Sequence, residues 1–495
     1  MSTADMAGRL DHGRTGSAAK SSATRPATGS MTGPMTGKET KAEKAARAAE
    51  LVARMFSEDD KREKFIPVTL QAIMDRLAQP AAWPAGHTAH VRRFHGYLAN
   101  WRRQSYSAKL MDLGRAYEPF SPDSDLLVTR KYSELDRASL RAQLVDGMCD
   151  LMQQANFTRI EEDQIDLVLT KDSHYGLDLH VDLEAFDVLQ IYYRGAIVRQ
   201  GSRRSIKQLY LRKEEFDIPI FQRLAIVFKL KPEGMRIREI MAKQGLDQDK
   251  AERLVKKMRG LVSDQIKPDY VYLKLFKNIP RSDIEMVFPN TKIRFRLFDK
   301  IKLGVTASGG LGVGVAGTMT KIAIASNPIA LAGALAGLGG IAMRQVVNYS
   351  NQRNKYMVKM AQNLYSHALA DNRGVMTLLA ERAAEEDLKE EVLLYSILAK
   401  ETVCESEIGA VDKAIERYLA RTFGIDVNFD VKDALRRLKE DGLVTQAADG
   451  TLVTLPPEAA AARIDKLWDG YLDDMVERAT TEGVEFEGAA PESLT

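Results

Sequence analysis

The chain has 495 residues, of which 71 are lysine or arginine and 68 are aspartate or glutamate, so its formal net charge is +3. This length is sufficient for two to four domains, and the near balance of charges argues against a global attraction to nucleic acid or to an anionic surface. The two cysteines, Cys149 and Cys404, lie far apart without CxxC spacing. This spacing argues against a disulfide framework and a cysteine-rich zinc site, and it favours a reducing compartment for the soluble parts.

The first part of the chain changes character twice. Residues 1–45 are rich in Ser, Thr, Gly, Ala and Met, and we expect them to be disordered. Residues 46–165 have a mostly helical pattern of apolar positions. From 166 to 302 the apolar residues recur with a period that approaches two, which predicts strands and hence a mixed α+β domain. A helical insertion is predicted within it over 232–262.

The segment 303–343 has Lys321 as its only formal charge and is otherwise filled mainly with glycine, alanine and aliphatic residues. A bilayer core about 30 Å thick needs about 20 apolar helical residues per crossing, so the segment predicts a two-helix transmembrane hairpin. Basic residues precede and follow the segment, which predicts that both soluble sides face the cytoplasm or its equivalent. In a bacterium, the membrane would be the inner membrane. The alternative is a Gly/Ala-rich hairpin that is buried in a soluble fold or peripheral on the bilayer.

Glycines within this segment have the spacing of helix-packing motifs. The pairs Gly310 with Gly314 and Gly333 with Gly337 each place two glycines on one helix face. Such pairs permit close approach of backbones within a hairpin or between copies of the chain, so they predict packing or self-association. The GxGxxG match over 312–317 has no preceding strand and no acidic residue about twenty positions later, and we do not interpret it as a dinucleotide site.

The chain after the hairpin divides again. Residues 344–402 predict long helices, and 403–480 has the order helix, helix, β-hairpin that is typical of a winged-helix module. Residues 481–495 form an acidic tail that we expect to be disordered. The expected fold class is α+β and multidomain, with an N-terminal helical region, a mixed α+β domain, a two-helix transmembrane hairpin, and C-terminal helices with a winged-helix-like module.

One candidate polar site comes from alternating and clustered acidic residues. One face of a predicted strand carries a histidine and three carboxylates, namely Asp178, His180, Asp182 and Glu184. They could bind a divalent cation or simply form the exposed face of an amphipathic strand. Asp283 and Glu285 could line a site or could belong to a structural turn. No cofactor and no metal is assigned from this pattern.

Three further groups have an ordinary structural interpretation. His87, His90 and His95 are expected to be surface residues. The acidic run over 385–391 is expected to be the solvated face of a helix. The helix over 431–441 has balanced basic and acidic residues, which disfavours nucleic acid and favours a protein-interaction or structural role.

Many short motifs together resemble a known family. The match extends from about 62 to 471 and resembles the transmembrane protein 143-like family, which is defined by a domain of unknown function. The motifs include Phe65 to Pro67, Tyr117 to Phe120, Tyr193 to Gly195, Phe221 to Leu224, Phe276 to Pro280 and Asn363 to Tyr365. The resemblance implies a multi-pass membrane protein with large soluble parts, and it implies no reaction, cofactor or catalytic residue.

The sequence therefore predicts a membrane-anchored scaffold or interaction protein whose partners are the lipid bilayer and another protein or a second copy. The patterns GxxxxGK(S/T), GxSxG and HExxH are absent from the sequence, so enzymatic activity is not indicated. Two alternatives stay open: a membrane-surface enzyme that uses an acidic cluster, and a membrane-tethered nucleic-acid binder that uses the winged-helix-like module.

Overall fold

The fold is taken from a computed structural model, which describes residues 41–56, 62–124, 130–169, 177–204, 213–260, 262, 265–289, 291–295, 358, 365–473 and 484–485.

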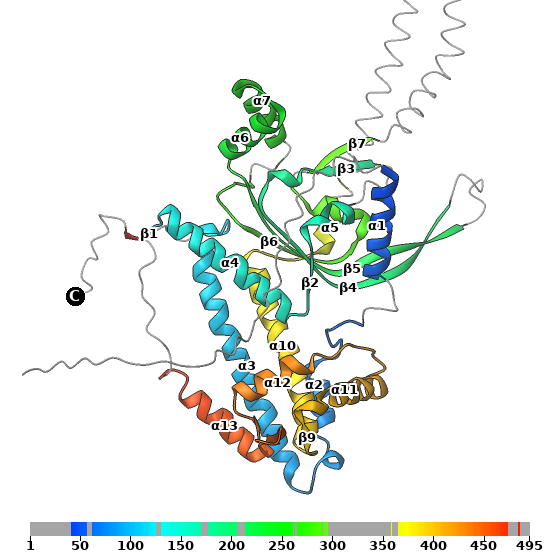
Figure 1. Ribbon diagram of the computed structural model, residues 1–495, viewed down its shortest axis with the longest axis vertical. Coiled ribbons are helices and arrows are strands. Elements are labelled where there is room, and N and C mark those ends of the chain that lie inside the picture. Colours follow the sequence, from blue (N-terminus) through cyan, green and yellow to red (C-terminus); the bar gives the residue numbers. More distant parts are fainter. Residues whose placement is uncertain are drawn as a thin grey trace, which may run out of the picture.

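The centre of the fold is an antiparallel sheet of five strands in the order β2-β4-β5-β6-β8 (Figure 1). Strands β4 (Phe186–Arg204) and β5 (Lys213–Leu230) pair along their whole length, from Phe186 opposite Leu230 to Arg204 opposite Lys213. Strand β6 (Tyr272–Pro280) lies on the other side of β5, and the short strands β2 (Thr158–Ile160) and β8 (Ala368–Asp371) form the edges. The five consecutive residues 224–228 of β5 are buried. Since successive side chains of a strand point to opposite faces, both faces of the sheet are covered.

Helices cover the first face. They are α3 (His87–Tyr117), α4 (Glu134–Gln154) and the first half of α10 (Arg373–Leu398). Tyr192, Ala225 and Val227 of the sheet belong to the core formed with these helices. Ser133 precedes α4 and forms a capping box with Asp136. The Ser133 side chain accepts a hydrogen bond from the Asp136 N–H, and the Asp136 carboxylate accepts one from the Ser133 N–H.

Shorter elements cover the second face. They are α1 (Lys41–Phe56), α5 (Glu162–Val168), the 3₁₀ helix η5 (Arg281–Val287) and a two-stranded sheet of β3 (Leu177–Val181) and β7 (Thr291–Phe295). Ile191, Tyr193, Leu224, Ile226 and Phe228 of the large sheet belong to this core. The two cores thus take alternate residues of the same strands, as a period of two requires.

A third core joins the ends of α3 and α10, the two longest helices in the described ranges, to the C-terminal elements. It contains α2 (Leu70–Leu77), α11 (Ile408–Phe423), α12 (Val431–Glu440) and α13 (Pro457–Asp469), together with a three-stranded sheet in the order β10-β11-β9. These strands are β9 (Val403–Cys404), β10 (Val444–Gln446) and β11 (Thr451–Thr454). The expected order of helix, helix and hairpin is present, but its core is shared with α2, α3 and α10. The limits 403–480 of a separate module stay a prediction.

The remaining elements are short or peripheral. Helices α6 (Glu233–Gln244) and α7 (Gln248–Arg259) form the helical insertion that the sequence predicts over 232–262. Strands β1 (Arg130–Lys131) and β12 (Val484–Glu485) pair with each other. The 3₁₀ turns are η1 (Pro80–Ala82), η2 (Glu118–Phe120), η3 (Leu183–Ala185) and η6 (Glu405–Glu407).

The membrane part of the expected fold class is wrong. No helix in the described ranges is both long enough and apolar enough to cross a bilayer. Helix α3 has 31 residues but contains Arg92, Arg93, Arg102 and Arg103. The structure supports a mixed α/β fold built on a five-stranded antiparallel sheet. The same finding contradicts two further expectations: the multi-pass membrane localisation with cytoplasmic soluble domains, and the presence of transmembrane helices.

The hairpin itself lies outside the described residues. The segment 303–343 belongs to the part of the chain for which no structure is described, and so do the helix-packing candidates Gly310, Gly314, Gly333 and Gly337.

Two glycines allow a test of the backbone. Gly195 in β4 has φ +71°, and a Cβ there would collide with the side-chain oxygen of Gln222. Gly96 lies inside α3, where an added Cβ meets nothing within 4 Å. We expect Gly195→Ala to destabilise the fold by about 1 to 2 kcal/mol, because alanine disfavours positive φ. We expect Gly96→Ala to stabilise it by about 1 kcal/mol through helix propensity. Urea unfolding measures both, and a stabilising Gly195→Ala would contradict the assigned backbone.

Candidate functional site

Helix α10 buries a run of acidic residues where the cores on its two ends meet. Its first half contributes Val375 to Ala384 to the core beneath the sheet, and its second half contributes Leu388 to Leu398 to the C-terminal core. Between them, four carboxylates are at most 5% exposed: Glu386, Asp387, Glu390 and Glu391. The expectation of a solvated acidic face is therefore wrong. Buried carboxylates require partners, since an unpaired buried charge is costly.

The central partner is Arg437 of α12, which is itself 4% exposed. Its Nε donates to Glu391 at 2.7 Å, and its Nη2 donates to Glu390 at 2.6 Å. Its Nη1 lies 3.1 Å from Asp387 and also donates to Asp433. All three nitrogens of the guanidinium group are therefore used by carboxylates from two helices.

A second arginine joins the cluster from α3. Arg102 Nη2 lies 2.9 Å from Glu391 and donates to Asp441 at 2.7 Å. The hydroxyl of Tyr106, one turn further along α3, donates to Asp387 at 2.6 Å. The cluster thus links α3, α10 and the end of α12 through charge-assisted hydrogen bonds, which are stronger than neutral ones.

The cluster shifts the titration of its members. Burial raises the pKa of the Glu391 carboxyl to about 7, although the nearby Arg102 and Arg437 oppose this shift. Burial also raises the pKa of Asp387, and it raises the pKa of Glu390 well above its ordinary value. Carboxyl groups outnumber guanidinium groups in the cluster, and repulsion from neighbouring carboxylates such as Asp387 adds to burial in raising the pKa of Glu390 and Glu391.

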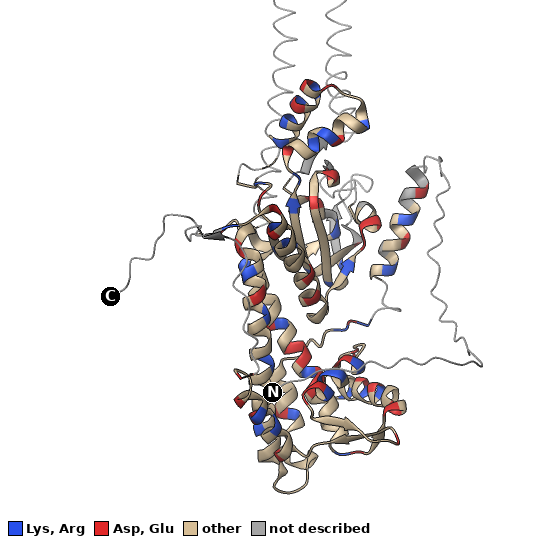
Figure 2. Cartoon of the chain, turned by 60° about the vertical axis from the view of Figure 1, so that its left-hand side comes forward, with Lys and Arg blue, Asp and Glu red and all other residues tan. Residues whose placement is uncertain are grey.

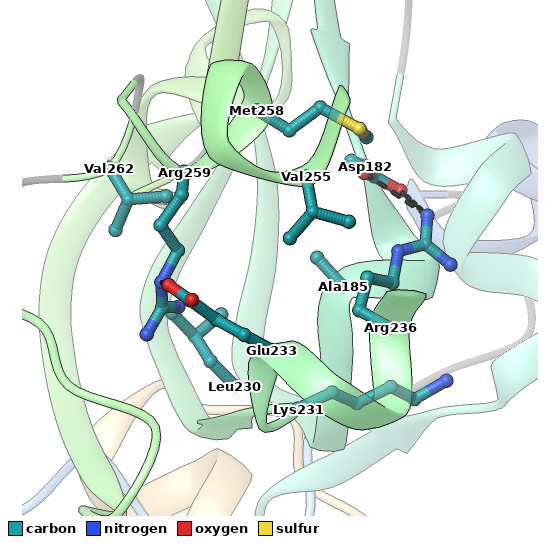
Figure 3. A pocket seen from close by; sticks show the side chains of 10 residues that line it. All are labelled: Asp182, Ala185, Leu230, Lys231, Glu233, Arg236, Val255, Met258, Arg259 and Val262. Atoms are coloured by element: carbon teal, nitrogen blue, oxygen red, sulfur yellow. Dashed lines mark hydrogen bonds and ion pairs between the residues drawn. The ribbon is translucent and has the colours of Figure 1, made fainter. Parts of the chain in front are cut away.

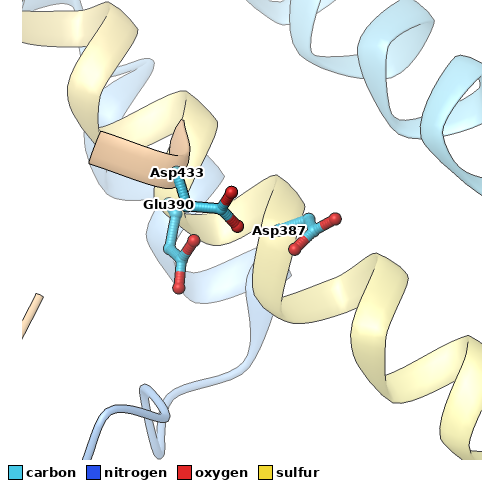
Figure 4. A group of neighbouring side chains, drawn as sticks. All are labelled: Asp387, Glu390 and Asp433. Carbon is cyan, nitrogen blue, oxygen red and sulfur yellow. The ribbon is translucent and has the colours of Figure 1, made fainter. Parts of the chain in front are cut away.

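Three of these carboxylates could hold a metal ion. One oxygen each of Asp387, Glu390 and Asp433 lies within 4.8 Å of the others (Figure 4). Carboxylate oxygens suit hard cations such as Mg²⁺ and Ca²⁺. The Arg437 guanidinium contacts all three carboxylates, so a cation would first have to displace it. The arrangement is that of a closed ion-pair cluster.

A second buried pair on α10 binds a main-chain segment. The Glu386 carboxylate accepts from the Ile66 N–H at 2.9 Å, and Lys389 Nζ donates to the Ile66 carbonyl at 3.0 Å. Lys389 and Glu386 also pair with each other at 3.0 Å. Three residues earlier, the Glu63 side chain accepts from the Ala196 N–H of β4 at 3.1 Å. We call residues 62–67 the strap, since they connect α10 with the sheet.

The structure distributes the candidate polar site over two places. Asp178 and His180 lie in β3, opposite Arg294 and Lys292 of β7, and their side chains lie outside the described part. Asp283 and Glu285 lie in η5 and are 8% and 1% exposed. Burial lowers the pKa of the neighbouring Arg281 to about 10, and Glu285 opposes this shift.

Asp182 follows β3 and pairs with Arg236 of α6 at 3.2 Å. Both residues line a cavity of about 40 Å³ between the sheet and the α6–α7 hairpin (Figure 3). This space is too small for a typical ligand, whose pockets measure about 300 to 1,000 Å³. That Asp178, His180, Asp182, Asp283 and Glu285 form a functional site stays a prediction.

The three histidines near the start of α3 differ in environment. His87 is exposed and His90 is partly exposed, whereas His95 is 1% exposed. The expectation of a surface position is therefore wrong for His95. Neither ring nitrogen of His95 has a hydrogen-bond partner among the described residues, and burial lowers its pKa to about 4.

Comparison with known proteins identifies one domain. Residues 221–374 match the family described as protein of unknown function (DUF3754). This confirms the coarser part of the resemblance, a domain of unknown function, while nothing names the transmembrane protein 143-like family. No solved structure matches the chain. The matched region contains most of β5, the α6–α7 hairpin, β6 and β8, and it ends at the start of α10, before the Arg437 cluster.

The Arg437 cluster predicts a large difference between neighbouring arginines. Arg437→Met leaves buried carboxylates without their cation, and we expect a destabilisation of about 3 to 5 kcal/mol. Arg436→Met is the matched control, since Arg436 is 54% exposed and pairs with Asp433 and Glu440 at the surface. We expect it to cost less than about 1 kcal/mol. Urea unfolding measures both variants, and equal small losses would show that the cluster contributes little.

His95 predicts a dependence of stability on pH. Its pKa is about 4 in the folded protein against 6.5 for the free side chain. Between these values the unfolded chain binds more protons, so folding stability falls as the pH drops through this window. We expect wild type to lose about 2 to 3 kcal/mol more than His95→Leu between pH 7.5 and about 4.5. Urea unfolding at the two pH values measures this difference, and identical losses would refute it.

Proposed function

We propose that this protein is a non-enzymatic interaction protein, a scaffold in which α10 connects the large sheet with the C-terminal helices. The observation that carries the proposal is the occupation of the buried carboxylates by Arg437. A general acid, a general base or a metal site needs access to substrate. The carboxylates of α10 instead contact guanidinium groups, an ammonium group and a tyrosine hydroxyl of the same chain.

The charges of α12 support a protein partner over nucleic acid. Arg436 pairs with Asp433 and Glu440, Arg437 is buried, and Lys439 donates to Glu405 at 2.8 Å. Phosphate binding needs cations that are free to replace counterions. On this helix, internal pairing leaves little positive charge for a phosphate backbone.

A second candidate function is hydrolysis assisted by a divalent cation. The observation that favours it is the proximity of the Asp387, Glu390 and Asp433 oxygens. It would require the Arg437 side chain to leave the cluster.

Metal titration separates the two functions. For a scaffold we expect no change in Tm with Mg²⁺, Ca²⁺, Mn²⁺ or Zn²⁺ and no turnover of p-nitrophenyl phosphate by the purified chain. The positive expectation is a protein that copurifies in stoichiometric amount and rebinds after purification. Metal-dependent turnover that Asp387→Asn abolishes, with Tm unchanged, would establish the hydrolytic alternative and overturn the scaffold.

A further inference from the structure

The α6–α7 hairpin stands apart from the rest of the fold (Figure 1). Each helix has 12 residues, and Gly245 ends α6 with φ +62°. The Asp247 side chain accepts from the Asp249 N–H at the start of α7. The two helices share a small core of their own around Ile240, Ala251 and Val255. The hairpin is therefore an independently packed projection from the sheet.

The hairpin carries an excess of positive charge. Residues 232–260 contain eight basic and five acidic residues, a surplus of three that equals the formal net charge of the whole chain. Figure 2 shows the basic residues spread over both helices at the top of the view.

Part of this charge holds the hairpin in place. Arg236, which is 8% exposed, pairs with Asp182, Glu184 and Glu239. Arg259 lies 3.4 Å from Glu233, which ties the end of α7 to the start of α6. These ion pairs fix the position of α7 relative to the sheet.

Three cations of α7 serve no such purpose. Arg253 and Lys256 are exposed, and so is Lys257. Within the described part of the chain, none of the three has an ion pair or a hydrogen bond to another side chain. Positions i, i+3 and i+4 lie on one face of a helix, so the three side chains form a basic ridge on the last two turns of α7.

We infer that the basic ridge of α7 is a docking surface for an acidic segment of a partner protein. The inference is based on charge complementarity, since the carboxylates of an acidic segment could pair with three cations that have no partner in the described chain. The inference rests on the proposed scaffold function and names the surface and the chemistry of its partner.

The distribution of charge on α7 favours a protein over a nucleic acid. Two helices joined at a glycine also occur in duplex-binding proteins, where the first turns of the second helix face the bases. In α7 those turns carry Asp249 and Glu252, next to Asp247. In that binding mode their carboxylates would lie close to the phosphates of a nucleic acid and repel them, because both groups are negatively charged. Residues 232–260 also contain no aromatic residue on which a single-stranded base could stack.

The test uses the full chain and a fluorescein-labelled oligoglutamate peptide, with binding followed by fluorescence polarisation at low salt. The test variant combines Arg253→Gln, Lys256→Gln and Lys257→Gln, which keeps helix propensity and removes the charges. The matched control combines Lys413→Gln, Arg417→Gln and Arg421→Gln on α11, which removes the same number of positive charges from three exposed residues. Circular dichroism and Tm verify that both variants fold.

We expect wild type to bind the peptide with an affinity that falls as salt is added, since exposed charges are screened. The α7 variant should bind about tenfold more weakly, and the α11 variant within about twofold of wild type. Equal losses in both variants would reduce the binding to net charge and overturn the inference. Tighter binding of a short DNA duplex that the α7 variant abolishes would overturn it in favour of nucleic acid.

The result is separable from the scaffold proposal. If wild type does not bind the peptide, the docking surface is refuted, while the copurification experiment decides the scaffold function independently. If a stoichiometric partner copurifies equally with wild type and the α7 variant, the scaffold stands and the ridge is not its docking surface.

Discussion

The structure depends on a cation placed between buried carboxylates. A helix that buries four acidic side chains is stable only if positive groups meet them there, since lone buried charges are costly. Arg437 of α12 and Arg102 of α3 supply these groups to α10. The pairs constrain the spacing and rotation of three helices at the place where the two cores meet. The C-terminal helices are thereby held to the sheet by charge as well as by apolar packing.

The long strands could be predicted from sequence, and the edges of the sheet could not. The strands β4, β5 and β6 all lie within 166–302, where the period of apolar residues near two predicts strands. Strands β2 and β8 have three and four residues, which is too short for a period to be visible. They come from 158–160 and 368–371, outside the range that the sequence assigns to the mixed domain. Their pairing is set by tertiary contacts.

The acidic residues of the cluster were visible in the sequence, but their environment was not. A run of glutamate and aspartate within a helix ordinarily marks a solvated face, and nothing near 385–391 identifies Arg437 as a partner 46 residues after Glu391. One signal was available. The apolar residues in the second half of α10, between Leu388 and Leu398, occur on every side of the helix. A helical segment without a polar face is buried all round, so charged residues within it and next to it are expected to be buried too.

The strap is recognised in an unusual way, because Glu386 and Lys389 contact the main chain of Ile66 and not its side chain. Every residue except proline offers the same N–H and C=O groups. The identity of residue 66 is therefore specified only by the apolar space that its side chain fills. The two α10 residues, in contrast, are specified by their charges and lengths. Another apolar residue of similar volume at position 66 keeps both main-chain hydrogen bonds, whereas loss of either charge at 386 or 389 leaves the other charge buried without this partner.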